Sequence, residues 1–302
     1  MARTDQMPAE STAAGHQGSD SGRSGQSLQR NEVGDLLQRL AEMAPHDPLE
    51  VSVRHRSTHL LNALFHDLVC LAEPALFVEA GAFEAETSVR VAAAVPGCRV
   101  VAFEANPYVY ERFSASTDYT GQRVEYRHQA LSREPGEVPI FLIASSSSWS
   151  DDRVEGYNSL LKRVGGDWLG DVEYEEVAVP ATTLDHEFTD MGGRFAMWMD
   201  VEGATEMVLA GAEAFLDRCD VIKIEVEESA FWSNQWLVAD VVAEMARHGL
   251  EPLARDFETE EQYNVLFGSR ELISRSDVQS RIALHHNQAS ATATESRGTC
   301  ST

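Results

Sequence analysis

From residue 74 to about residue 250, short apolar runs alternate with segments whose apolar residues recur at helical spacing. The apolar runs have the length of buried strands, and the segments between them are long enough for helical crossover connections. This alternation predicts an α/β fold with a mostly parallel sheet and helices on both faces. The predicted strands are 75–80, 98–105, 123–131, 194–203 and 220–228, and the predicted helices are 86–95, 107–117 and 235–248.

Two parts of the pattern depart from this alternation. Residues 251–255 and 263–269 read as strands with no helix between them, which predicts an antiparallel hairpin at one edge of the sheet. Residues 133–193, between the third and fourth core strands, contain two further predicted strands, 137–144 and 174–184. A long loop that begins with a run of serines joins these inserted strands.

The ends of the chain differ in composition from its centre. Residues 1–30 and 274–302 are rich in Ser, Gly, Ala, Gln and Thr, so we expect two disordered tails. Residues 31–44 and 58–72 have the periodicity of amphipathic helices, and we interpret 31–73 as an N-terminal helical cap. The main domain is then 74–273.

Composition narrows the class of protein. The chain has 302 residues, with 24 Lys and Arg against 49 Asp and Glu, which gives a formal charge of −25. This charge disfavours binding to a nucleic-acid backbone. The four scattered cysteines fit a reducing compartment, and no window is long and apolar enough for a membrane span. We therefore expect a soluble cytoplasmic protein.

Acidic residues end most of the predicted core strands. In open α/β sheets the ligand binds beyond the carboxyl ends of the strands, so these residues are the first candidates for a site. The residues at the strand ends are Glu79, Gly81, Glu104, Ala105, Asn106, Gln129, Ala130, Asp200, Glu202, Glu225 and Glu227.

The turn after the first strand is rich in acids and poor in glycine. Glu104 lies 23 residues after Gly81, where an acid accepts hydrogen bonds from ribose hydroxyls in nucleotide-type sites. The second and third glycines of a dinucleotide motif are replaced by Phe83 and Glu86. A pyrophosphate near these glutamates would cost roughly 2–4 kcal/mol for each like-charge pair at 4–8 Å. S-adenosylmethionine has no phosphate and carries a sulfonium and an ammonium, so the pattern favours it over NAD.

Four segments also resemble the FkbM-type family of class I S-adenosylmethionine-dependent methyltransferases. These are "FVEAGAFEAETS", "VVAFEANP", "RHQALS" and, most specifically, "WMDVEGATEMVLAGA". The segments "VIKIEVE" and "VPATTLDHEF" match in order and spacing. The resemblance covers about residues 75–270 and implies a Rossmann-like class I fold. It also implies methyl transfer, most often to a hydroxyl of a sugar, polyketide or other secondary metabolite.

The resemblance and the strand-end pattern together give the expected site. Asp200 and Glu202 are the candidate catalytic bases. The expected cofactor-binding residues are Glu79, Gly81, Ala82, Glu104, Ala105, Asn106, Gln129, Ala130 and Asp200. No residue is assigned as a metal ligand, although a divalent cation held by the same acids is an alternative to a direct base. The expected partner is a small molecule with a hydroxyl group.

Several alternatives stay open. Asp200 and Glu202 are also suitable caps for a helix that begins near Ala204. The family pattern usually has Asn and Gly at the positions of Phe83 and Ala85, and Lys at the position of Trp198. These departures motivate a non-catalytic scaffold as a second hypothesis. An NAD(P)-dependent reductase is a third, which the glycine pattern disfavours.

Overall fold

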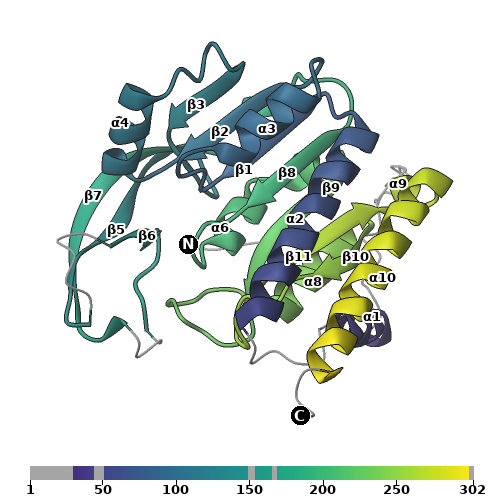
Figure 1. Ribbon diagram of the computed structural model, residues 1–302. Helices are drawn as coiled ribbons and strands as arrows, with labels where there is room; N and C mark the ends of the chain where they lie inside the picture. The colour runs from purple at the N-terminus through teal and green to yellow at the C-terminus, as the bar shows by residue number, and fades with distance from the viewer. Residues whose placement is uncertain (1–29, 44–50, 149–153, 165–168, 299–302) are drawn as a thin grey trace, which may run out of the picture.

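A seven-stranded sheet lies at the centre of the part of the chain that the structure describes (Figure 1). The structure is a computed structural model, and it describes residues 30–43, 51–148, 154–164 and 169–298. The strand order is β10-β11-β9-β8-β1-β2-β3. The bounds are β1 Leu76–Ala80, β2 Arg99–Glu104, β3 Val124–His128, β8 Phe195–Met199, β9 Cys219–Glu227, β10 Leu250–Arg255 and β11 Gln262–Ser269.

The predicted mostly parallel sheet is confirmed. β1 pairs in parallel with β2 and β8, and β2 with β3 and β8 with β9 do the same. β11 pairs antiparallel with both β10 and β9, so β10 and β11 form the predicted hairpin at one edge. The chain reverses its order of strands between β1 and β8, which is where ligands bind in doubly wound folds.

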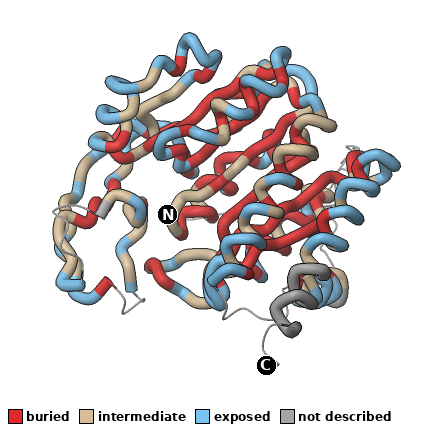
Figure 2. Tube along the Cα trace, in the orientation of Figure 1, coloured by how far each residue is buried: buried red, intermediate tan, exposed pale blue. Residues whose placement is uncertain are grey.

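The central strands are buried on both faces, as Figure 2 shows. Alternate residues of β1 divide between two hydrophobic clusters: Leu76, Val78 and Ala80 belong to one, and Phe77 belongs to the other. Successive strand side chains point to opposite faces, so one apolar run supplies both layers of the core. This is the reason that the strands read as continuous apolar runs in the sequence.

Helices cover both faces of the sheet. The first cluster packs under α1 Arg30–Glu42, α5 Leu184–Phe188, α6 Thr205–Ala210, α7 Glu213–Leu216 and α8 Val238–Arg247. The second packs under α2 Val51–Ala72, α3 Glu86–Ala94, α9 Arg270–Ile273 and α10 Ser276–Gly298. α4 Pro107–Ser116 contacts β2 and β3.

The first two helices do not form one cap. Leu36 and Leu40 of α1 belong to the first cluster, whereas Leu61 and Phe65 of α2 belong to the second. The two helices therefore lie on opposite faces of the sheet, and each is part of a helical layer. The two helices are close in the sequence, which suggested a common unit. Each instead packs its apolar side chains against a different face of the sheet.

The expectation of a disordered C-terminal tail is wrong for Ser276–Gly298, which form α10. This helix lies beside α2 (Figure 1). Two apolar residues attach this helix to the core: Val278 is fully buried, and Ile282 packs one turn later against the second cluster. His285 is also buried on α10. The predicted N-terminal tail, 1–30, lies outside the described residues except for Arg30.

The inserted segment, together with the two residues of β4 just before it, forms a second sheet with the strand order β4-β7-β5-β6. Its strands are β4 Ala130–Leu131, β5 Gly136–Ser146, β6 Val154–Ser159 and β7 Val172–Thr182. β5 and β7 confirm the two predicted strands. β6 was not predicted, because its sequence VEGYNS has no apolar alternation. It pairs with β5 by antiparallel contacts.

The position of Gly81, directly after β1, has no room for a side chain. Its φ angle is 72°, and a Cβ built there would lie 1.7 Å from the carbonyl oxygen of Asp200. The single glycine of this turn thus lets the ends of β1 and β8 approach each other.

We predict that Gly81→Ala lowers the free energy of unfolding by roughly 2–4 kcal/mol, through left-handed strain and the backbone clash. Gly97→Ala is the matched control, because a Cβ there meets nothing within 4 Å. Urea denaturation of both variants provides the measurement. Equal stability of the two variants would contradict this packing.

Candidate functional site

A pocket of about 260 Å³ opens at the carboxyl ends of the main-sheet strands, between that sheet and the second sheet. Seven of the nine expected cofactor residues line it. These are Gly81, Glu104, Ala105, Asn106, Gln129, Ala130 and Asp200. Glu202, one of the two candidate bases, also lines the pocket, and Asp200 is the other.

The pocket lining is acidic. Among its described residues it contains four carboxylates, Glu104, Glu155, Asp200 and Glu202, and no Lys, Arg or His. A negative field in a partly enclosed space attracts cationic groups and repels phosphates. The lining therefore suits a ligand that carries positive charge.

Glu104 joins the turns that follow β1 and β2. Its Oε2 accepts a hydrogen bond from the backbone N–H of Phe83 at 2.7 Å, and its Oε1 accepts one from the backbone N–H of Asn106 at 2.7 Å. Each carboxylate oxygen has a second lone pair that can still accept a hydrogen bond. Burial raises the pKa of Glu104 to about 7, against these backbone bonds, which lower it. A ligand that donates to both oxygens would stabilise the charged form.

Glu79 has a different position. It is buried but does not line the pocket, and its Oε2 accepts a hydrogen bond from the backbone N–H of Ser88 in the first turns of α3 at 2.8 Å. Burial raises its pKa to about 7 as well. The alternation along β1 turns the side chain of Glu79 towards α3 and away from the pocket. Ala82, the other expected residue outside the lining, is buried in the second hydrophobic cluster.

Two of the three departures from the family pattern, Phe83 and Ala85, fall on left-handed positions of the turn after β1. Phe83 has a φ angle of 48° and Ala85 one of 54°. Asn and Gly, the usual residues there, adopt this conformation most easily, and other residues are strained by about 1–2 kcal/mol. Phe83 lines the pocket and packs against Phe113, with the ring centres 5.3 Å apart, and the Arg112 guanidinium lies over its ring. These contacts hold the Phe83 ring against α4.

Asn106 has a structural role in addition to lining the pocket. Its Oδ1 accepts hydrogen bonds from the backbone N–H groups of Tyr108 and Val109, at 3.0 and 3.4 Å, so it caps α4. Pro107 follows at the first position of the helix, where its missing N–H has no cost. The cap fixes the backbone that presents the Asn106 N–H to Glu104.

The acids of the DVEG stretch do not cap the following helix. The N-cap residue of α6 is Ala204, directly before the helix, and no side chain makes a capping hydrogen bond there. Asp200 and Glu202 instead lie beside Glu225 of β9, with one carboxylate oxygen of each within 4.8 Å of the others. The capping alternative is therefore wrong in its geometry.

Burial raises the pKa of each acid in this group. Desolvation is the largest cause for Asp200, Glu202 and Glu225, and the neighbouring carboxylates add to it for Glu202 and Glu225. Glu227, two residues further along β9, has its pKa raised to about 8 for the same reasons. Carboxylates with raised pKa values are suited to accept a proton near neutral pH.

The wall of the pocket formed by β6 and the residue after it was missed from the sequence. Glu155, Gly156, Asn158, Ser159 and Leu160 line it. Ser159 Oγ donates to the backbone carbonyl of Glu202 at 2.6 Å, which ties the second sheet to the DVEG turn. The segment has no apolar periodicity and no motif that marks it, so only its position after a predicted strand could have drawn attention to it.

Comparison with known proteins decides the family. The family description "Methyltransferase FkbM domain" matches residues 79–252, which is more than half of the chain. The chain belongs to the FkbM methyltransferase family. This family implies S-adenosylmethionine as the methyl donor, and it confirms the resemblance that the four sequence segments indicate. No curated protein matches the chain by sequence.

Solved structures of several methyltransferases are distantly similar. A methyltransferase FkbM from Methylobacillus flagellatus KT has 12% identity and a TM-score of 0.39, and the match covers 78% of this chain and 59% of that one. An O-methyltransferase from Bacillus cereus in complex with SAH has 12% identity and a TM-score of 0.36, over 80% and 92% of the two chains. These values are too low to carry an argument about function, so the Rossmann-like assignment rests on the strand order and the family. In the described residues, no helix is both long and apolar enough to cross a membrane.

Proposed function

We propose that this FkbM-family protein transfers a methyl group from S-adenosylmethionine to a hydroxyl oxygen of a small molecule, such as a sugar, a polyketide or another secondary metabolite. The observation that carries the proposal is the acidic pocket at the ends of β1, β2 and β8, whose described lining has no basic side chain. The chain's charge of −25 supports a small-molecule acceptor over a nucleic acid.

The residues of the pocket fit this cofactor. The Glu104 carboxylate would accept hydrogen bonds from the two ribose hydroxyls, since each of its oxygens keeps a free lone pair beside its backbone bond. Gln129 and Ala130 would border the adenine. The surrounding carboxylates favour a sulfonium and an ammonium. A pyrophosphate in the same place would face Glu104, Asp200 and Glu202.

When bound, S-adenosylmethionine supplies an electrophilic methyl group whose transfer to a nucleophile leaves S-adenosylhomocysteine. The protein has to hold the acceptor hydroxyl in line with the breaking carbon–sulfur bond and to take up its proton as the carbon–oxygen bond forms. Asp200 and Glu202 lie at the end of β8, on the pocket wall, and we assign the proton to one of these carboxylates. Burial raises the pKa of both carboxyl groups, which makes each carboxylate a stronger base than one in water.

Two other functions are weaker. A nicotinamide-dependent reductase would have to place a pyrophosphate in the acidic pocket. A non-catalytic scaffold of the same fold was suggested by Phe83 and Trp198. Phe83 keeps the left-handed backbone, and Trp198 lies beside Lys223 in the register of β8 and β9. Lys223 is fully buried and lies over the Trp198 ring, so a lysine remains in this layer.

The first test concerns the cofactor. A ligand that binds only the folded protein stabilises it by mass action and so raises its melting temperature. At a free ligand concentration of 100 times the Kd, the free energy of unfolding rises by about 2.7 kcal/mol. We expect S-adenosylhomocysteine to raise the melting temperature and NADH to leave it unchanged. Differential scanning fluorimetry with each ligand is sufficient, and stabilisation by NADH alone would exclude the proposed function.

The second test concerns the proton acceptor. Asp200→Asn and Glu202→Gln preserve shape, so S-adenosylhomocysteine should still bind them. The variant that lacks the proton acceptor should transfer methyl groups roughly 10²- to 10⁴-fold more slowly. The rate is measured with labelled S-adenosylmethionine and an extract that contains the acceptor. Full activity in both variants would place the proton acceptor elsewhere.

A further inference from the structure

Three carboxylates from separate parts of the chain converge beside the cofactor pocket. Asp200 follows β8, Glu202 lies in the turn after it, and Glu225 belongs to β9. One oxygen of each lies within 4.8 Å of the others. β8 and β9 are parallel neighbours, so their carboxyl ends bring these side chains together.

Two oxygens of this cluster accept no hydrogen bond. Glu225 is only 7% exposed, and its Oε2 is a buried acceptor that has no donor in the described structure. Glu202 Oε2 is in the same situation. Buried polar atoms are almost always satisfied, and buried charge without compensation is costly. These orphan oxygens therefore point to a bound group that is positively charged and accepts oxygen ligands.

Among the described residues, two cations lie near this cluster, and neither donates a hydrogen bond to the two orphan oxygens. Lys223 lies two residues before Glu225 on β9, but Nζ donates to Asn62 Oδ1 of α2 at 2.7 Å. The ammonium also lies over the ring of Trp198. Lys223 points to the same face of β9 as Glu225 and lowers the pKa of Asp200, but its hydrogen bond goes to α2. Arg163 also lies near Glu202 and lowers its pKa. Glu227 and Glu258 lie near the same cluster and raise the pKa of Glu225, so acids outnumber cations there.

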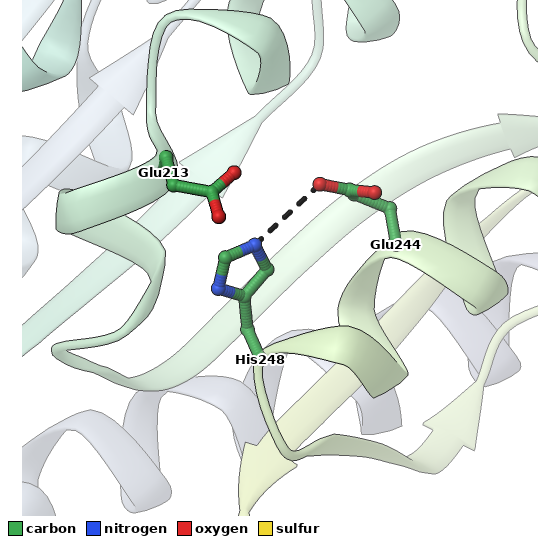
Figure 3. Close-up of side chains that lie close together, drawn as sticks. All are labelled: Glu213, Glu244 and His248. Atoms are coloured by element: carbon green, nitrogen blue, oxygen red, sulfur yellow. Dashed lines mark ion pairs between the residues drawn. The ribbon is translucent and has the colours of Figure 1, made fainter. Parts of the chain in front are cut away.

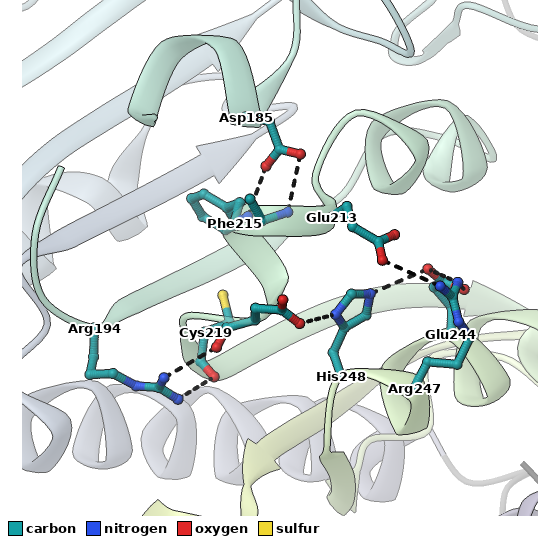
Figure 4. A network of polar contacts seen from close by, with 10 residues as sticks. Asp185, Arg194, Glu213, Phe215, Cys219, Glu244, Arg247 and His248 are labelled. Atoms are coloured by element: carbon teal, nitrogen blue, oxygen red, sulfur yellow. Dashed lines mark hydrogen bonds and ion pairs between the residues drawn. The ribbon is translucent and has the colours of Figure 1, made fainter. Parts of the chain in front are cut away.

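A second acid cluster in the same protein shows what compensation looks like. Glu213, Glu244 and His248 come close together near the ends of α7 and α8 (Figure 3). Arg247 pairs with Glu244 at 2.6 Å and with Glu213 at 3.4 Å, and His248 Nδ1 lies 2.8 Å from Asp217 Oδ1 (Figure 4). Basic side chains balance the acids there, so this cluster is an ion-pair network.

We propose that Asp200, Glu202 and Glu225 form a binding site for one divalent cation of the hard, oxygen-preferring class, such as Mg²⁺, Mn²⁺ or Ca²⁺. The three described residues offer carboxylate oxygens and no His or Cys ligand. Mg²⁺, Mn²⁺ and Ca²⁺ prefer oxygen ligands, whereas Zn²⁺ and Cu²⁺ prefer nitrogen or sulfur. Water and the acceptor would complete the coordination shell.

The role of this cation rests on the proposed function, although its binding does not. A hydroxyl that coordinates a divalent cation loses its proton more easily, so a weaker base suffices. The oxygens of Asp200 and Glu202 that do not bind the cation would still take that proton. The cation would also fix the acceptor on the side of β8 and β9, next to the methyl donor.

The test measures Mn²⁺ binding directly, because free Mn²⁺ gives an electron paramagnetic resonance signal that disappears on binding. We expect the wild-type chain to bind one Mn²⁺ with a Kd of about 10⁻⁵ to 10⁻³ M. Glu225→Gln and Glu202→Gln should each weaken binding by roughly tenfold or more, since each removes a charged ligand. Glu244→Gln, in the ion-pair network, is the matched control and should bind as the wild type does.

Binding of S-adenosylhomocysteine to the same samples separates the two proposals and checks the fold. If S-adenosylhomocysteine binds but millimolar Mn²⁺ does not, the cation site is wrong and the methyltransferase proposal stands. If Mn²⁺ binds but S-adenosylhomocysteine does not, the cation site stands and the methyltransferase proposal is wrong. Equal Mn²⁺ affinity in the wild type and in folded Glu225→Gln and Glu202→Gln would also overturn the site. The site would also be overturned if an organic diamine raised the melting temperature of the protein and Mn²⁺ did not. That result would assign the acids to a cationic acceptor.

Discussion

The arrangement of the site depends on the Glu104 carboxylate. It is buried at the end of β2, and its two oxygens hold the backbone N–H groups of Phe83 and Asn106. These bonds fix the turn after β1 relative to the turn after β2. The same turns border the pocket, so one side chain sets its shape and presents two acceptor oxygens to it. A charged acceptor strengthens each of these bonds relative to a neutral one.

The concentration of acids around Glu104 distinguishes this site from a phosphate-binding one. Dinucleotide sites bring backbone N–H groups and a helix N-terminus to a pyrophosphate through several glycines. Here the one glycine of the turn, Gly81, serves close packing against Asp200. Burial raises the pKa values of Glu104, Asp200 and Glu202, which means that the pocket holds negative charge at a cost. A cationic ligand removes that cost, and this links the electrostatics to the choice of cofactor.

The sequence predicted the parts of this structure that have a strong local signal. The core strands, the edge hairpin and most of the pocket lining follow from apolar runs and from the rule that parallel strands end at one edge. The position of the Glu79 side chain was not predicted. Glu79 lies near the end of its strand, as Glu104 does, but the alternation of side chains along β1 directs it to α3. β6 and α10 were missed for another reason. Their segments have few apolar residues, and contacts with β5 and α2 determine their structure.

Glu79 and Glu104 offer a direct comparison, because both are buried glutamates at strand ends that accept backbone hydrogen bonds and have a pKa of about 7. Only Glu104 lines the pocket. The decisive measurement is the calorimetric Kd of S-adenosylhomocysteine for the wild type, Glu104→Gln and Glu79→Gln at a pH above those pKa values. The account predicts that Glu104→Gln weakens binding by roughly 30-fold, from about 2 kcal/mol of lost charge-assisted hydrogen bonding. Glu79→Gln should stay within about threefold of the wild type, and an equal loss in the two variants, or a loss in Glu79→Gln alone, would contradict it.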